Sequence, residues 1–251
     1  MTNERLRAAI HAAGMTMDQL SGTVGVDPKT VERWVSTDRV PHRSHRQKVA
    51  AVLRHDEVFL WPTTLSEART QCASAAEFVA MHPSRGGIPP GTWSSLIHQA
   101  TESIDLFAYS ASFLHDSVDG YGEQLREKAE HGVKVRLLFA DPKSDSVKRR
   151  GEEEGIGHLL AARCELTWAY YAPLLRHHGI QAREHDETVY CSIFRFDEVL
   201  LANTHTLGTP ASQSPVVQVR HVPGGRLFST FMRSFERGWG RARDVVREDV
   251  A

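Results

Sequence analysis

In the first part of the chain, residues that begin and end helices follow one another closely, and they constrain the local fold more than any other feature. Thr16 followed three residues later by Gln19 is the signature of a capping box, which begins a helix. Gly25 then supplies a turn. Asp27 before Pro28 indicates the next helix start, because proline is tolerated at the first helical position. We therefore expect two short helices joined by a tight turn.

Two further helices complete a predicted all-α bundle in residues 1–62. Apolar residues recur at helical spacing from Asn3 to Ala13, and Gly14 ends that helix. A fourth helix is expected over about 44–53. In the third helix the apolar positions share one face and leave polar or basic residues on the other, namely Lys29, Thr30, Arg33 and Ser36.

This polar face suits the major groove of DNA. Lysine and arginine donate hydrogen bonds to guanine edges and phosphates, and threonine reaches a phosphate or a thymine methyl. Three arginines that follow the helix are expected to contact the DNA backbone: Arg39, Arg43 and Arg46. The pattern predicts a DNA-binding helix-turn-helix. The alternative is a small bundle used for protein contacts, with these arginines as a solvated face.

The run from Met17 to Val35 resembles the lambda-repressor-like helix-turn-helix family, which includes the Cro and Xre regulators. Residues 39–43 (Arg-Val-Pro-His-Arg) and 60–62 (Leu-Trp-Pro) resemble an actinobacterial branch of that family. The resemblance implies a transcription regulator that binds double-stranded operator DNA as a homodimer on two half-sites. Ser21 and Gly22 depart from the alanine that the family usually carries in the second helix.

Residues 63–91 are expected to form a linker. Apolar residues at near-helical intervals predict a helix over about 65–81, and the run from Pro83 to Gly91 ends it.

The third predicted segment, 92–251, alternates between apolar strands and helices. Strands are expected over 104–109 and 133–140 with a helix over 122–130 between them, which implies a parallel right-handed crossover. Further helices are predicted over 93–100, 144–175 and 227–243, and four short strands over 180–185, 189–196, 199–203 and 216–221. The predicted fold class is α+β and multidomain: a helix-turn-helix bundle followed by an α/β domain with a mixed sheet.

Polar side chains gather where these strands end. Because ligands bind beyond the carboxyl ends of parallel strands, we expect eight residues to line one crevice: Tyr109, Ser110, Asp141, Arg183, His185, Arg195, Asn203 and His205. Arginine and histidine in such a crevice suit a phosphate or another anion. The alternative is that they are edge-strand charges and internally bonded polar groups.

The second domain resembles one half of the phospholipase D superfamily. The resemblance rests on residues 104–109, 132–142 and 179–185, and on the hairpin that turns at 196–198. Superfamily members with a single half pair to complete a site, which implies a homodimer. Their catalytic pattern is His-x-Lys, four residues and Asp, with Gly-Ser or Gly-Thr further on.

That catalytic pattern is broken in this sequence. With His185 as the nucleophile, Glu187 stands at the lysine position and Ser192 at the aspartate position, and only a longer strand would bring Asp197 there. Asn203 lies near where the Gly-Ser element would fall. A carboxylate repels the phosphoryl oxygens that a lysine neutralises. We therefore expect no catalysis, and a domain that binds a phosphorylated or nucleotide-like small molecule without turnover.

Three functions stay open at this point: a ligand-responsive transcription regulator, a DNA-targeted phosphodiesterase or nuclease using His185, and a DNA-binding protein whose second domain recruits other proteins. Other classes fit less well. The sequence carries no apolar run that could span a membrane and no secretory signal pattern. Cys72, Cys164 and Cys191 have no paired spacing, which favours a reducing cytoplasm and no metal site or cofactor. A net charge of −1 argues against a protein coated in nucleic acid, but leaves room for a small DNA-reading head.

Overall fold

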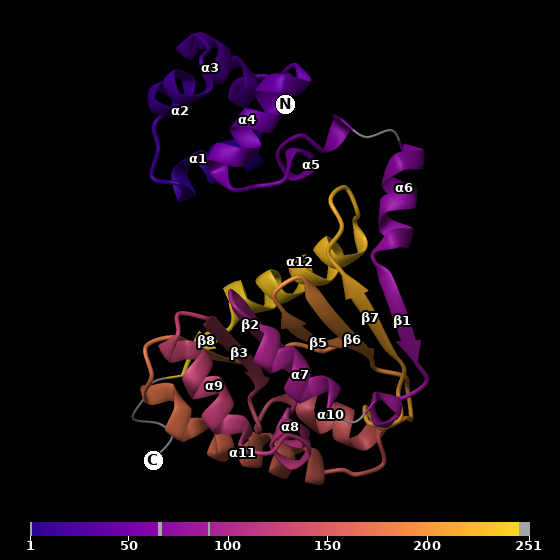
Figure 1. Cartoon of the computed structure of the whole chain (residues 1–251). Helices are drawn as coiled ribbons and strands as arrows, with labels where there is room; N and C mark the ends of the chain where they lie inside the picture. Colours follow the sequence, from indigo (N-terminus) through magenta and orange to yellow (C-terminus); the bar gives the residue numbers. More distant parts are fainter. Residues whose placement is uncertain (1, 65–66, 90, 246–251) are drawn as a thin grey trace. The chain divides into compact units, whose positions relative to one another are not determined.

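The computed structural model describes residues 2–64, 67–89 and 91–245 (Figure 1). The chain divides into two compact units. Unit 1 comprises Met1–Ala76 and Val222–Arg226, and unit 2 comprises Glu77–His221 and Leu227–Ala251. None of the described helices is long and apolar enough to cross a membrane.

Unit 1 is built from helices. They are α1 (Glu4–Ala12), α2 (Met17–Val24), α3 (Pro28–Ser36), α4 (Arg43–Leu53), α5 (Glu57–Leu60), the 3-10 turn η1 (Pro62–Thr64) and α6 (Glu67–Ala76). One apolar core holds the first five helices together, with fully buried side chains that include Leu6, Leu20, Val31, Val49, Leu60 and Trp61.

The helix caps and the turn that the sequence predicts in unit 1 are confirmed. The Thr16 side chain accepts from the Gln19 backbone N–H, and the Gln19 side chain accepts in return from the Thr16 N–H, so both capping-box bonds are present. Gly25 ends α2 with φ = 80°, a left-handed conformation that glycine adopts without steric cost. Asp27 then accepts from the Lys29 N–H at 2.9 Å and caps α3.

The helix expected over 65–81 is shorter than predicted. Residues 65 and 66 lie outside the described residues, and α6 ends at Ala76. Phe78–His82 instead form strand β1, which pairs antiparallel with β7 (Val216–Arg220). The apolar residues of this segment do not mark a buried helical face, since Phe78, Val79 and Met81 are exposed. Pairing with a strand distant in sequence decides the conformation here, as is usual for strands.

Unit 2 contains an eight-stranded mixed sheet in the order β1-β7-β6-β5-β2-β3-β4-β8. The strands β2 (Ser103–Ala108), β3 (Lys134–Ala140) and β4 (Ile180–His185) are parallel, and the pairing of β2 with β3 confirms that the predicted crossover joins parallel strands. The remaining pairings among the described strands are antiparallel, through β5 (Cys191–Phe196), β6 (Val199–Thr204) and the short edge strand β8 (Arg243–Asp244).

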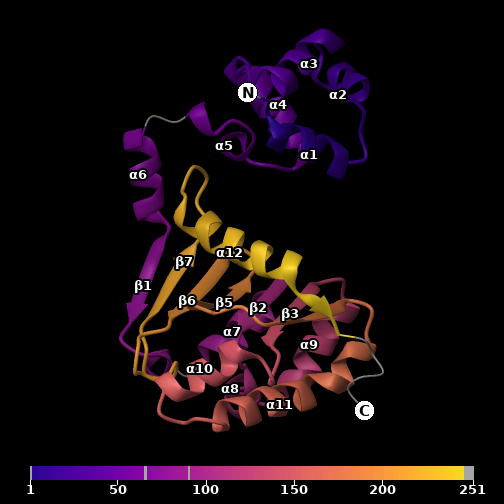
Figure 2. The ribbon, with the colours of Figure 1, turned by 180° about the vertical axis from the view of Figure 1, so that it is seen from behind.

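Helices cover both faces of this sheet. Figures 1 and 2 show α12 (Leu227–Arg241) on one face and α7 (Thr92–Gln99), α8 (Ser112–Ser117) and α9 (Tyr121–Glu130) on the other. Two apolar cores follow from this arrangement. One joins α7, α8 and α9 to the sheet, and the other places Phe228 and Phe235 of α12 against Phe107 and Leu138. The multidomain α+β class with a mixed sheet is therefore as predicted.

The long helix expected over 144–175 is divided into α10 (Asp145–Glu153), α11 (Leu159–Tyr171) and the 3-10 turn η3 (Ala172–Arg176). The chain turns back after α10, and the Gly157 N–H donates to the Gly151 carbonyl at 2.8 Å. A Cβ atom on Gly151 would lie 2.1 Å from the Gly157 carbonyl oxygen. Only glycine allows this approach, so the break between the helices depends on the residue at position 151.

Candidate functional site

The helix-turn-helix of unit 1 presents its polar face to solvent. Lys29, Arg33 and Ser36 on α3 are exposed and Thr30 is half-buried, whereas Val31, Trp34 and Val35 on the opposite side are buried in the core. The Asp27 cap and the Gly25 turn fix where α3 begins, so they also fix the direction in which this face points. The geometry is that of a helix able to enter the major groove.

The three arginines after α3 do not all behave alike. Arg39 and Arg43 are exposed. Arg46 is half-buried; its Nε lies 3.1 Å from a carboxylate oxygen of Glu57, and its Nη1 donates to the Pro41 carbonyl at 3.1 Å. Arg46 therefore ties α4 to α5 and to the loop before α4, a role that the sequence does not indicate.

A cavity of about 280 Å³ lies in unit 2 near the carboxyl end of β2. Three of the eight predicted crevice residues line it: Tyr109, Ser110 and His205. Further polar or charged residues of the lining are Arg85, Ser112, Asp116, Glu154, Arg163, Ser192 and Ser212, and Phe113, Leu160, Pro210 and Ala211 are its apolar part. The segments that meet here are far apart in sequence, since they come from η2 (Arg85–Gly87), the ends of β2, β5 and β6, helices α8 and α11, and the β6–β7 loop.

His205 and Tyr109 form one wall of this cavity. Their rings stack with centroids 5.7 Å apart, and the His205 Nε2 lies 2.9 Å from the Ser192 hydroxyl oxygen. Burial, together with the positive charges of Arg150 and Arg85, lowers the pKa of His205 to about 4. The imidazole is therefore neutral at neutral pH.

The side chains of Tyr109 and Ser110, the other two predicted residues that line this cavity, are held by hydrogen bonds. The Tyr109 hydroxyl accepts from the Val189 N–H at 3.0 Å. Burial raises the pKa of Tyr109, so the phenol stays protonated. The Ser110 hydroxyl lies 2.8 Å from the Thr167 hydroxyl and donates to the Arg163 carbonyl at 3.2 Å. These bonds fix the wall in one arrangement.

The expectation that all eight residues share one crevice is wrong for the remaining five. Arg195 pairs with the buried carboxylate of Asp105 at 2.8 Å, and Asn203 is fully buried and donates to the Ser214 carbonyl. Arg183 donates to the Trp239 carbonyl of α12 and pairs with Asp244. These three side chains make structural contacts inside unit 2, because α12 and the β6–β7 loop cover the part of the sheet from which they project.

Asp141 and His185 line a separate hollow of about 240 Å³. His185 is only 2% exposed; its Nε2 lies 3.1 Å from the Ala108 carbonyl, and its ring meets Phe107 edge-on. Burial lowers the pKa of this imidazole. Asp141 pairs with Arg243 at 3.0 Å, and Glu187 at the same hollow pairs with Arg241 at 3.1 Å. Neither Asp141 nor His185 lines the cavity of Tyr109 and His205.

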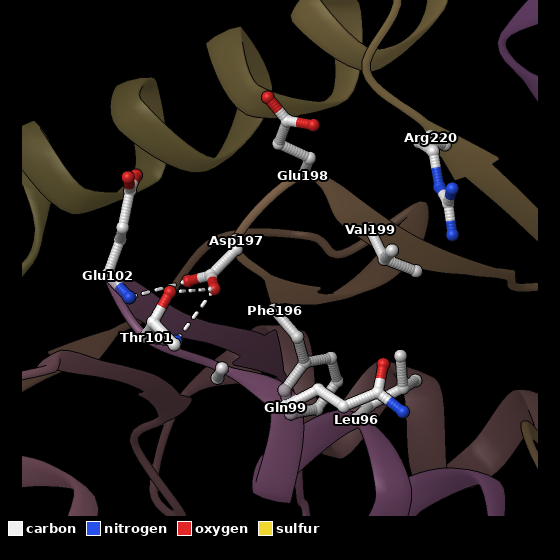
Figure 3. Close-up of a pocket in the computed structure, with 10 residues that line it drawn as sticks. Leu96, Gln99, Thr101, Glu102, Phe196, Asp197, Glu198, Val199 and Arg220 are labelled. Atoms are coloured by element: carbon white, nitrogen blue, oxygen red, sulfur yellow. Dashed lines mark hydrogen bonds between the residues drawn. The ribbon is translucent and has the colours of Figure 1, made fainter.

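A third hollow, of about 330 Å³, lies at the start of β2, and Asp197 is among the residues that line it (Figure 3). The Asp197 carboxylate accepts from the backbone N–H groups of Thr101, Glu102 and Ser103 at 2.7–2.9 Å. Burial alone would raise the pKa of this carboxyl, but the hydrogen bonds outweigh it and lower the pKa. Asp197 thus fastens the β5–β6 turn to the chain entering β2.

Comparison with known proteins places the chain in a family. A family model described as "Domain of unknown function (DUF5919)" matches residues 75–218, more than half of the chain. The chain belongs to this family. Every residue that lines the cavity of Tyr109 and His205 falls inside the matched DUF5919 segment. No curated protein matches the chain.

Several solved structures are similar to the chain at low identity. TrmBL2, an archaeal chromatin protein described as showing a novel mode of DNA binding, is 14% identical, with a TM-score of 0.43 over 81% of this chain and 62% of that one. Nuc, a phospholipase D family member from Salmonella typhimurium, is 19% identical, with a TM-score of 0.38 over 61% of this chain and 88% of that one. Phosphatidylserine synthase from Haemophilus influenzae Rd KW20 is 12% identical, with a TM-score of 0.36 over 66% and 39%. The DUF5919 protein thus spans less than two thirds of the first of these chains.

Two cavity residues, Arg85 and Arg163, could not be identified from the sequence. Arg85 belongs to the run that reads as a helix-breaking loop, and Arg163 to a helix. Neither belongs to a motif, and they are brought together only by the fold of unit 2. No local signal in the sequence marks them.

Proposed function

We propose that this DUF5919 protein is a sequence-specific DNA-binding transcription regulator, in which unit 1 reads an operator and unit 2 forms a homodimer and binds a small phosphorylated or nucleotide-like molecule. The observation that carries the proposal is the capped helix α3, whose exposed face offers Lys29, Arg33 and Ser36. Dimerisation is supported by the two-half-site geometry of helix-turn-helix proteins.

Binding without turnover is the second part of the proposal. His185, the candidate nucleophile, is buried against Phe107, and Glu187 at the lysine position is paired with Arg241. If Asp197 is instead taken as the aspartate of the phospholipase D pattern, Ser192 falls at the lysine position and Tyr190 at the histidine position. Neither alignment supplies both a nucleophile and a cation for the phosphoryl oxygens.

The decisive experiment is an electrophoretic mobility shift on the DNA upstream of the protein's own gene. The Lys29→Ala/Arg33→Ala double variant removes two base- or phosphate-reading groups, each worth about 1–3 kcal/mol if it contacts a base. We expect the variant to lose specific binding. Arg69→Ala removes an exposed arginine of unit 1 outside the helix-turn-helix and serves as the control. Equal binding by the double variant and the wild-type protein would refute the assignment of α3.

A further inference from the structure

Two guanidinium groups at the cavity of unit 2 form no ion pair with any of the described residues. Arg85 and Arg163 both line it, and within residues 2–64, 67–89 and 91–245 neither side chain makes an ion pair or a hydrogen bond. Arg85 is half-buried, whereas Arg163 is exposed at the rim. Other buried or half-buried arginines of unit 2 form ion pairs: Arg150 binds Glu154, and Arg136 and Arg195 bind Asp105. Burying a cation without a partner of opposite charge costs free energy. Arg85 is unusual in unit 2 because it is half-buried and forms no ion pair with the described residues.

Arg85 is held in place by the turn that carries it. The Gly87 N–H donates to the Ser84 hydroxyl at 3.1 Å, and the Gly86 N–H donates to the Ser212 carbonyl on the β6–β7 loop at 3.3 Å. The guanidinium carbon lies 3.9 Å from the centre of the Phe113 ring, a cation–π contact that leaves its N–H donors free. Burial lowers the pKa of Arg85 to about 10, so the group remains charged at neutral pH.

The two acidic residues of the cavity, Glu154 and Asp116, form no ion pair with Arg85 or Arg163 in the described part of the chain. Glu154 lies 2.8 Å from Arg150, and both side chains are 5% exposed; Arg150 also pairs with Glu153 at 3.4 Å. Asp116 is exposed and makes no ion pair with either arginine in the described part of the chain. Among the residues that line the cavity, Glu154 is thus bound to Arg150 and Asp116 is exposed, so neither occupies the hydrogen-bond donors of Arg85 or Arg163.

Neutral hydrogen-bonding groups complete the site. Ser110, Ser112 and Ser212 bring hydroxyls to the lining. His205 is neutral, and its Nδ1 is buried without a hydrogen-bond partner among the described residues. Serine hydroxyls beside arginine forks are a common way to bind the oxygens of a small anion.

We propose that Arg85 and Arg163 bind the oxyanion end of a small organic acid in this cavity, with the serine hydroxyls as additional donors. The cavity of about 280 Å³ suits a metabolite-sized molecule. The shared chemistry is a phosphomonoester or a carboxylate. Neither arginine occupies a position of the phospholipase D pattern. The inference rests on the proposed ligand-binding role of unit 2 and names the residues and the ligand class.

Isothermal titration of the full chain with three probes at fixed ionic strength tests the proposal. Inorganic phosphate is the smallest probe, and glycerol phosphate and glycerate share a carbon skeleton but end in a phosphate or a carboxylate. We expect at least one of them to bind. Arg85→Gln and Arg163→Gln should each raise its dissociation constant about 10- to 100-fold, since each removes charged hydrogen bonds. The probe that binds more tightly identifies the anion.

Two kinds of control variant separate recognition from charge and from folding. Arg237→Gln changes the charge by the same amount at an exposed arginine of α12 outside the cavity, and it should bind like the wild-type protein. Arg85→Lys and Arg163→Lys keep the charge but lose the planar fork, and they should bind with intermediate affinity. A melting temperature without probe shows that each variant is folded.

The mobility shift on the same proteins distinguishes this inference from the proposed function. If the wild-type chain binds DNA but none of the probes, or binds a probe equally well without the two arginines, the anion site is refuted and the regulator stands. If the probes bind through Arg85 and Arg163 but no specific DNA binding is found, the anion site stands and the regulator does not.

Discussion

Asp105 is a fully buried acid of unit 2 that binds two arginines. Its carboxylate is fully buried on β2 and binds Arg136 Nε at 2.7 Å and Arg195 Nη1 at 2.8 Å. Two cations from the neighbouring strands β3 and β5 therefore depend on one anion. Removing one member of a buried ion network is costly, because the remaining charges stay buried without compensation.

We expect Asp105→Asn to lower the free energy of unfolding in urea by about 3–5 kcal/mol. The matched control is Glu236→Gln, since Glu236 also pairs with Arg136, at 2.8 Å, but its side chain is 53% exposed. An exposed pair of this kind contributes about 0–1 kcal/mol. Similar losses in the two variants would mean that burial does not set the strength of this network.

At the residue scale, sequence indicates chemical types better than partners. Tyr109, Ser110 and His205 line one cavity, and each of them follows or ends a recognisable strand. Arg195 and Asn203 satisfy the same rule, yet they bind Asp105 and the Ser214 carbonyl. The partner of a side chain depends on the neighbouring strand and on the helix that covers it. Both are set by tertiary packing, so the local sequence pattern does not indicate them.

Two of the glycines inside the described helices are expected to respond in opposite ways to substitution. Gly151 in α10 sits against the Gly157 carbonyl, whereas Gly22 in α2 has open space where a Cβ would lie. Alanine is favoured over glycine inside a helix by about 0.5–1 kcal/mol when nothing obstructs it. We therefore expect Gly22→Ala to raise the free energy of unfolding of unit 1 by about that amount.

Gly151→Ala should act in the opposite direction. The new methyl group meets backbone, which cannot move aside as a flexible side chain can, so we expect a loss of about 1–3 kcal/mol. Urea unfolding of both variants against the wild-type protein measures the two effects. Stabilisation by Gly151→Ala would show that the turn between α10 and α11 adjusts freely.

Elements with local start and stop signals could be predicted, whereas strand β1, whose conformation depends on a distant partner, could not. The capping box at Thr16 and the Pro28 start depend on residues within four positions of each other, and the structure reproduces both. Strand β1 has no such signal. Its residues continue the alanine-rich spacing of α6, and only the pairing with β7 makes them a strand.

At the scale of the whole molecule, Glu77 and β1 join the beginning of unit 2 to its end. The fully buried Glu77 carboxylate accepts from the N–H groups of Leu227 and Phe228 at 2.6 and 3.3 Å, which caps the first turn of α12. Its carbonyl accepts from the Arg220 N–H at 2.8 Å. A fragment that begins at residue 92, the boundary expected from the sequence, lacks all of these contacts.

We expect the fragment 75–251 to unfold in one cooperative transition and the fragment 92–251 to be markedly less stable or to aggregate. Loss of β1 exposes the β7 edge, and loss of Glu77 leaves the α12 N-terminus uncapped. Thermal unfolding followed by circular dichroism, with light scattering for aggregation, compares the two. Equal melting temperatures would show that β1 adds little to the sheet.

The pairing of β1 with β7 also has a consequence for synthesis of the chain on the ribosome. The helices of residues 4–60 make their core from neighbours in sequence and can fold as soon as they emerge. Phe78–His82 emerge next, but their partner Val216–Arg220 is translated near the end. Throughout that interval the nascent chain displays an unpaired strand with exposed Phe78, Val79 and Met81, a segment suited to binding by a chaperone.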